Sequence, residues 1–195
     1  DGYEYPEPPV ETPCEKMKTL VANENYMKKI DSLGKNSILS RKKETGFSEN
    51  KSGVFTNLIP APSTDNSDGL KITITSNTKG YTHTHLNDYD TGKFNSNGEP
   101  VINQPIRMFS PADVNTLMTM AGFVTDGDYS QLYGTMVSSY GNYTIRFTGT
   151  TTDIKTGFDT EQWRLDYLNY RKDNKYWSFE KLFLNFLKDK MNIQD

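Results

Sequence analysis

The chain has 195 residues, a formal net charge of −3 and an isoelectric point near 5.5. This length suits a single domain with a sizeable hydrophobic core. The acidic balance provides no basic surface, so nucleic acid is not the expected partner, and no apolar run is long enough to predict a membrane-spanning helix.

The first residues predict a segment outside the folded domain. Residues 1–12 are acidic and rich in proline, which indicates a flexible terminus or linker ahead of a single domain over residues 13–195. Such a beginning suits a mature exported protein, periplasmic or extracellular, or a domain of a longer chain. Cys14 is the only cysteine, so a disulfide within the chain is excluded. We expect its thiol to be packed under the first helix.

The first half of the domain predicts one helix followed by strands. Apolar residues recur at helical spacing from Pro13 to about Leu33, and Gly34 ends this helix. Alternating apolar and polar residues then predict, in chain order, strands over 37–48, 54–59 and 70–75 and a further strand after the turn at 77–80. The last of these strands carries both histidines of the protein.

A long polar connection follows the histidines. Residues 86–109 are rich in Asn, Asp and Gly, and loops of this length inside a domain are often lids or binding loops. We therefore interpret them as an insertion with a functional role.

The second half predicts a helix, a hairpin and two more helices. The helix begins with Ser110 as its N-cap and Pro111 at its first position, and Gly122 ends it. The later elements are expected as strands over 132–139 and 143–148 and amphipathic helices over 159–171 and 178–191.

The pattern His83-Thr84-His85 predicts a metal site. Residues i and i+2 of a strand lie on one face of a sheet, so the two imidazoles can converge on one ion. Zinc sites use Cys, His, Asp and Glu, and catalytic sites use three protein ligands. With two histidines and one cysteine available, the third ligand is expected to be a carboxylate. Asp113, in the first turn of the helix that follows, is the best placed.

These residues together resemble the signature of the JAMM, or MPN-domain, metalloprotease family. That signature is a Glu, then His-x-His, then Ser-x-x-Asp. Here it is matched by Glu44 in Glu44-Thr45-Gly46-Phe47, by His83-Thr84-His85 and by Ser110-Pro111-Ala112-Asp113. The resemblance covers about residues 38–150 and implies an α/β fold. That fold is similar to the cytidine-deaminase-like fold, with a curved mixed sheet flanked by helices, and here it would carry helical additions at both ends.

The resemblance also implies a role for each site residue. His83, His85 and Asp113 would hold Zn²⁺, which makes hydroxide available at neutral pH. Glu44 would be the general base, with Glu49 as the next candidate, and Ser110 would help to stabilise the oxyanion. Two features depart from the family pattern: Leu86 replaces the usual proline after the second histidine, and the insertion over 86–109 is much longer than usual.

We therefore expect a zinc-dependent metallopeptidase or isopeptidase that hydrolyses a peptide-type amide bond in a peptide or protein substrate. The alternative is a catalytically inactive MPN-like module that binds proteins. A barrel hydrolase is a weaker alternative, because it would need more histidines and a longer chain. A zinc deaminase would need paired cysteines, which are absent.

Overall fold

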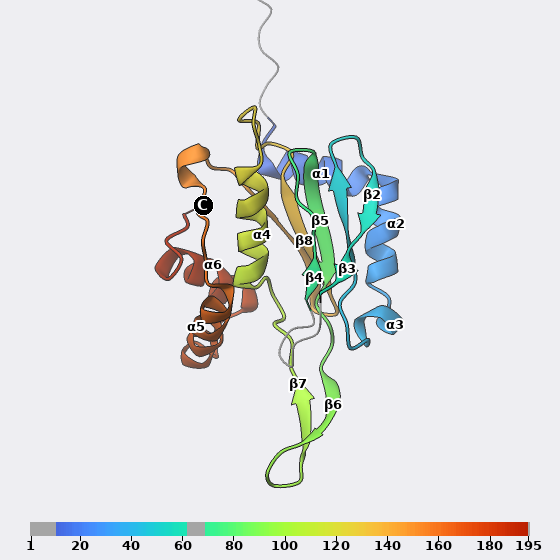
Figure 1. The fold of residues 1–195 in the computed structure, drawn as a ribbon, viewed down its shortest axis with the longest axis vertical. Helices are drawn as coiled ribbons and strands as arrows, with labels where there is room; N and C mark the ends of the chain where they lie inside the picture. The colour runs from blue at the N-terminus through green and yellow to red at the C-terminus, as the bar shows by residue number, and fades with distance from the viewer. Residues whose placement is uncertain (1–10, 62–68, 195) are drawn as a thin grey trace, which may run out of the picture.

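A five-stranded mixed sheet forms the centre of the fold in a computed structural model that describes residues 11–61 and 69–194. The strand order is β2-β1-β5-β8-β9. These strands are β1 (Gly46–Asn50), β2 (Phe55–Asn57), β5 (Thr78–Thr84), β8 (Tyr133–Ser138) and β9 (Gly141–Arg146). Figure 1 shows helices on both sides of the sheet. The predicted class, a mixed α/β sheet flanked by helices, is therefore confirmed.

Each face of the sheet is covered by its own apolar layer. On one face, α2 (Glu24–Leu33) places Tyr26 and Ile30 against Phe47, Tyr133 and Val137. The opposite face carries the larger cluster, to which α4 (Pro111–Gly122), α5 (Thr160–Asp173) and α6 (Phe179–Asp189) contribute. Tyr81 of β5 points into this second layer, so His83, two residues further along the same strand, faces α4.

The strand directions bring three chain segments together at the C-terminal end of β5, the central strand of the sheet. β5 and β8 are parallel, and the chain between them crosses back through α4, which places the start of α4 near the end of β5. β1 is antiparallel to β5, with Gly46 opposite His83. A Cβ atom on Gly46 would lie 2.3 Å from the backbone oxygen of Thr82. Only glycine therefore allows β1 to approach β5 so closely at this point.

The predicted helix over 13–33 is two helices, α1 (Pro13–Ala22) and α2. Asn23 separates them because its backbone is extended and its side chain accepts a hydrogen bond from the Tyr26 amide, which caps a new helix. Cys14 is exposed, and α1 buries none of its residues. The prediction of a packed thiol is therefore wrong, because α1 covers the surface without entering the core.

Two of the predicted strands are shorter than expected. The segment over 37–48 begins with a short helix, α3 (Asn36–Leu39), and becomes a strand only at Gly46. Leu39 is buried while all three residues of the basic run 41–43 are exposed, so the alternating burial of a strand is absent there. Within 70–75, only β4 (Leu70–Lys71) pairs, with β3 (Ile59–Pro60).

The insertion over 86–109 contains a hairpin that the sequence did not predict. Its strands are β6 (Tyr89–Phe94) and β7 (Pro100–Asn103), and the hairpin projects from the body of the molecule at the bottom of Figure 1. Phe94 is 69% exposed. Asp, Thr and Gly within β6 obscured the strand, because these residues are more typical of turns.

The remaining elements confirm the predictions within a few residues. They are α4 with Ser110 as its N-cap, the hairpin β8–β9, α5 and α6. A 3₁₀ turn (Thr151–Asp153) that was not predicted lies between β9 and α5. The predicted linker over 1–12 lies mostly outside the described residues. Among the described residues, no helix combines the length and the hydropathy needed to cross a bilayer.

A buried ion pair stabilises the end of the sheet that lies away from the histidines. Glu49 is 1% exposed, accepts a hydrogen bond from the Tyr133 hydroxyl at 2.5 Å and lies 2.8 Å from the Lys79 ammonium. Burial, together with the hydrogen bond to Glu49, raises the pKa of Tyr133, so this phenol stays protonated and donates. Glu49 therefore has two structural partners.

Replacing Glu49 alone is expected to destabilise the fold. Glu49→Leu should lower the free energy of unfolding by about 3 kcal/mol, the lower end of the range for breaking a buried pair, because Lys79 is still 21% exposed. Urea unfolding would measure this change. The double variant Glu49→Leu/Lys79→Leu should recover part of the loss, whereas Glu24→Leu, in an exposed pair with Lys28, should change little. An equal loss in Glu24→Leu would contradict this account.

Candidate metal centre

Two imidazoles meet at the end of β5. His83 is in the strand and His85 directly follows it, and both side chains are buried. Their Nε2 atoms lie 2.9 Å apart. The Nδ1 atom of His85 donates to the Ile106 carbonyl oxygen at 2.7 Å, since a carbonyl can only accept. This bond fixes the ring and directs the Nε2 atom toward His83, an arrangement typical of metal-binding histidines.

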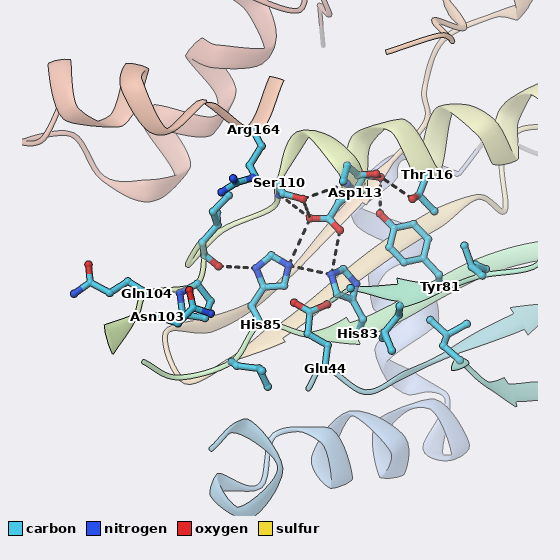
Figure 2. A pocket seen from close by; sticks show the side chains of 18 of the residues that line it. Glu44, Tyr81, His83, His85, Asn103, Gln104, Ser110, Asp113, Thr116 and Arg164 are labelled. Carbon is cyan, nitrogen blue, oxygen red and sulfur yellow. Dashed lines mark hydrogen bonds and ion pairs between the residues drawn. The ribbon is translucent and has the colours of Figure 1, made fainter. Parts of the chain in front are cut away.

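Asp113 brings a carboxylate to the same point from the first turn of α4. Its Oδ1 atom lies 3.0 Å from His83 Nε2, and its Oδ2 atom lies 3.5 Å from His85 Nε2. The hydroxyl of Tyr81, buried beside His83, donates to the Asp113 carbonyl at 2.7 Å and ties α4 to β5. The structure thus brings together the three metal ligands predicted from the sequence (Figure 2).

Glu44 approaches from the segment that precedes β1. The Thr84 amide donates to the Thr45 carbonyl at 2.9 Å, and the Thr45 amide donates to the Thr84 hydroxyl at 3.0 Å, so this segment is fixed beside β5. Glu44 is half-buried, and one of its carboxylate oxygens forms a group with the nitrogens of His83 and His85 in which all atoms lie within 4.8 Å of one another. Figure 2 shows the Glu44 side chain beside both histidines.

Glu49, the second candidate base, is not at this site. It pairs with Gly80 near the other end of the β1–β5 ladder and is held by Lys79 and Tyr133. Among the two carboxylates considered for proton transfer, only Glu44 reaches the histidines. Strand register therefore places Glu44, the first candidate from the sequence, beside the histidines and keeps Glu49 away from them.

The donor atoms fit a metal ion of the size of zinc. In a tetrahedral site with bonds of about 2.0 to 2.1 Å, neighbouring donor atoms are separated by about 3.3 to 3.4 Å. The two histidine Nε2 atoms are 2.9 Å apart, Asp113 Oδ1 is 3.0 Å from His83 Nε2, and the second carboxylate oxygen, Oδ2, is 3.5 Å from His85 Nε2. Two imidazoles and one carboxylate also form a donor set that zinc commonly uses. A carboxylate oxygen of Glu44 lies within the wider distance of 4.8 Å from a ring nitrogen of each histidine, so Glu44 can act as a fourth group at this centre.

The charges of the site are strongly coupled. Burial alone would lower the pKa of His85, but the hydrogen bond and charge of Asp113, with smaller contributions from Glu44 and the Ile106 carbonyl, raise it to about 9. Burial alone would raise the pKa of Asp113, but the charges and hydrogen bonds of His83 and His85 hold it well below its usual value. Asp113 is thus a carboxylate at neutral pH, as a metal ligand must be.

Ser110 orients the Asp113 carboxylate. The Ser110 amide and hydroxyl both donate to Asp113 Oδ2, at 2.6 and 2.7 Å, and the Asp113 amide donates to the Ser110 hydroxyl at 3.4 Å. This capping box holds Oδ2 and leaves Oδ1 directed at His83. The Ser110 hydroxyl hydrogen therefore has a partner already, so a role in oxyanion stabilisation stays a prediction.

Removing this hydroxyl is expected to weaken metal binding without abolishing it. Ser110→Ala should reduce zinc affinity roughly 10- to 100-fold, as loss of a hydrogen bond to a ligand typically does, and should cost about 1 kcal/mol of stability as a lost cap. Competition with a zinc indicator would measure the affinity. Ser178→Ala, which removes the N-cap of α6, is the matched control. Equal affinity of Ser110→Ala and wild type would mean that the Ser110 hydroxyl does not position Asp113.

A cavity of about 310 Å³ opens onto these residues. Apolar side chains form much of its wall, and the base of β7 and the start of α4 border it. Besides the residues of the candidate metal centre, the polar side chains that line the cavity include Arg164 of α5. Sequence reasoning missed Arg164 and the Ile106 carbonyl, since only tertiary packing brings them here. Tyr81 could have been found, because it precedes His83 by two residues and shares its face.

Comparison with known proteins gave no match to any family model, curated protein or solved structure. The chemistry of the site therefore rests on its own residues.

Proposed function

We propose that this protein is a zinc-dependent hydrolase that cleaves a peptide-type amide bond, as a peptidase or an isopeptidase. The observation that carries the proposal is the convergence of His83, His85 and Asp113 on one point, with the Glu44 carboxylate beside them in a cavity. The resemblance to the JAMM family suggests the same roles, and membership of that family is part of the proposal.

His83, His85 and Asp113 would hold the metal. When bound, zinc supplies a Lewis acid that makes water nucleophilic at neutral pH. Glu44 accepts the proton of the attacking water and delivers it to the leaving amine, a function that is typically worth about 10² to 10⁴ in rate. Ser110 keeps Asp113 in position, and Tyr81 fixes the helix that carries it.

A second candidate is a protein-binding module without catalysis. The hairpin β6–β7 favours it, because Phe94, Val101 and Ile102 are exposed on this projecting element. Exposed apolar residues that gather on one element often mark an interaction surface. The two candidates differ in one measurable respect. The hydrolase turns over substrate and needs Glu44 and the metal to do so, whereas the binding module turns over nothing.

The test is a cleavage assay with a mixed peptide library and a second library linked through lysine side chains. Zinc-loaded protein should release new amino termini or free lysine side chains, detected by mass spectrometry. A chelator should stop the reaction and added zinc should restore it. Cleavage that persists in His85→Ala, or no cleavage of either library by the zinc-loaded protein, would contradict the hydrolase proposal.

A further inference from the structure

One cationic side chain faces the proposed catalytic cavity from α5. Arg164 lines the cavity together with His83, Ser110 and Asp113. In Figure 2 its side chain comes from the Ser110 side of the site, opposite Glu44. α5 belongs to the C-terminal helices that the JAMM resemblance does not cover, so the signature residues give no reason for an arginine here.

Glu161 holds Arg164 in a fixed orientation. Arg164 Nε and Nη2 donate to the two Glu161 oxygens at 3.2 and 2.9 Å, one turn apart on α5. This bidentate contact occupies one edge of the guanidinium. In the part of the chain that the structure describes, Nη1 has no hydrogen-bond partner, so the second edge of the guanidinium can donate to another carboxylate. The Arg164 side chain is 35% exposed, which leaves it accessible from the cavity.

The charges around the cavity make Arg164 distinctive. Among the described residues that line it, Arg164 is the only arginine or lysine, and Glu44 and Asp113 are acidic. Arg107, which follows the cavity-lining Ile106 in the chain, is instead held by Asp88 at 3.0 Å and stacks on Tyr140. A negatively charged group of a ligand would be repelled by Glu44 and Asp113. Away from the metal centre, where a bound zinc ion would also carry positive charge, Arg164 is the one charged group among the described lining residues that would attract it.

The rest of the wall suits the body of a peptide. Leu70, Ile72 and Leu86 line the cavity, together with the polar residues Asn103 and Gln104 at the base of the hairpin. Apolar walls with a few polar groups are typical of ligand sites, and the polar groups fix the orientation of the ligand. A carboxylate anchored at Arg164 would therefore set how far the peptide extends past the histidines.

We infer that Arg164 binds a carboxylate of the substrate, so that the preferred substrates are peptides with a carboxylate close to the scissile amide. This inference rests on the proposed function, because it concerns the same cavity. The carboxylate can be the C-terminus of the peptide or the side chain of Asp or Glu. Arg164 is then a specificity-determining residue, and Glu161 positions it.

Binding to matched peptide libraries tests the inference without turnover. Glu44→Gln protein with added zinc is immobilised, and three acetylated tetrapeptide libraries are applied. One ends in a free carboxylate, one is amidated without acidic residues, and one is amidated and contains Asp or Glu. A charge-assisted contact predicts about tenfold or greater retention of a carboxylate library over the neutral one. The first and third libraries distinguish the two sources of the carboxylate.

Substitutions in the same protein identify the residue responsible. Arg164→Met should abolish the preference, and Arg164→Lys should restore part of it, because the charge returns without the fork. Lys172→Met removes one positive charge from an exposed position of the same helix and should leave the preference unchanged. Equal retention of all three libraries, including no retention of any, would overturn the inference.

Kinetics separate this inference from the proposed function. In otherwise wild-type enzyme, Arg164→Met should raise KM for carboxylate-bearing peptides by about tenfold or more, with a smaller change in kcat. If acids and amides are hydrolysed equally and Arg164→Met changes neither, the inference fails and the hydrolase proposal stands. If carboxylates are retained but nothing is cleaved, the hydrolase proposal fails and carboxylate binding by Arg164 stands.

Discussion

Glu44→Gln is expected to reduce the rate of amide hydrolysis by about 10²- to 10⁴-fold, the range typical of lost acid–base catalysis. Zinc should stay bound in near-stoichiometric amount. Glutamine keeps the size of the side chain but cannot accept a proton. The Glu44 segment is fixed to β5 through Thr45 and Thr84, so the substitution should not displace the histidines. Single-turnover kinetics and elemental analysis of the same sample would measure both effects.

Glu24→Gln provides the matched control, since Glu24 is an exposed residue of α2, which packs on the face of the sheet opposite the cavity. It should retain both activity and metal. Full activity of zinc-loaded Glu44→Gln would exclude Glu44 as the base. Loss of zinc in Glu44→Gln would instead make Glu44 a ligand, which the group of Glu44, His83 and His85 within 4.8 Å allows.

Asp113→Asn is expected to remove zinc from the protein. The amide is nearly isosteric and can still accept from Ser110, so the start of α4 should survive, but its negative charge is lost. The loss of affinity should exceed the roughly 10- to 100-fold that follows when only a hydrogen bond to a ligand is removed. Zinc titration with a fluorescent indicator would measure the affinity, and circular dichroism would verify the fold.

Asp31→Asn serves as its control, because Asp31 is an exposed residue of α2. It should bind zinc as tightly as wild type. Zinc binding by folded Asp113→Asn with wild-type affinity would show that Asp113 is not a ligand. The third ligand would then be sought at Glu44.

The residues of the candidate metal centre were more predictable than the fold around them. His83 and His85 share a face by strand periodicity, and Ser110 with Pro111 marks a helix start that carries Asp113 in its first turn. Both signals are local, so the sequence contains them. That the two segments meet follows from the parallel pairing of β5 with β8, which forces the chain between them to cross back through α4.

Features that depend on distant contacts could not be predicted. The motif favoured Glu44 over Glu49, but only the pairing of Gly46 with His83 shows that Glu44 lies at the histidines and Glu49 does not. The break between α1 and α2 depends on one capping side chain, Asn23, in a continuous helical pattern. Arg164 reaches the cavity because α5 packs beside α4, and no residue near it in the sequence indicates this.

The metal content of the purified wild-type protein, measured by elemental analysis beside His85→Ala, tests the central claim most directly. The account predicts close to one zinc per wild-type chain after incubation with zinc and removal of the excess, and its loss in His85→Ala. It would be contradicted by a folded wild-type protein that binds no zinc, or by zinc that His85→Ala retains in full.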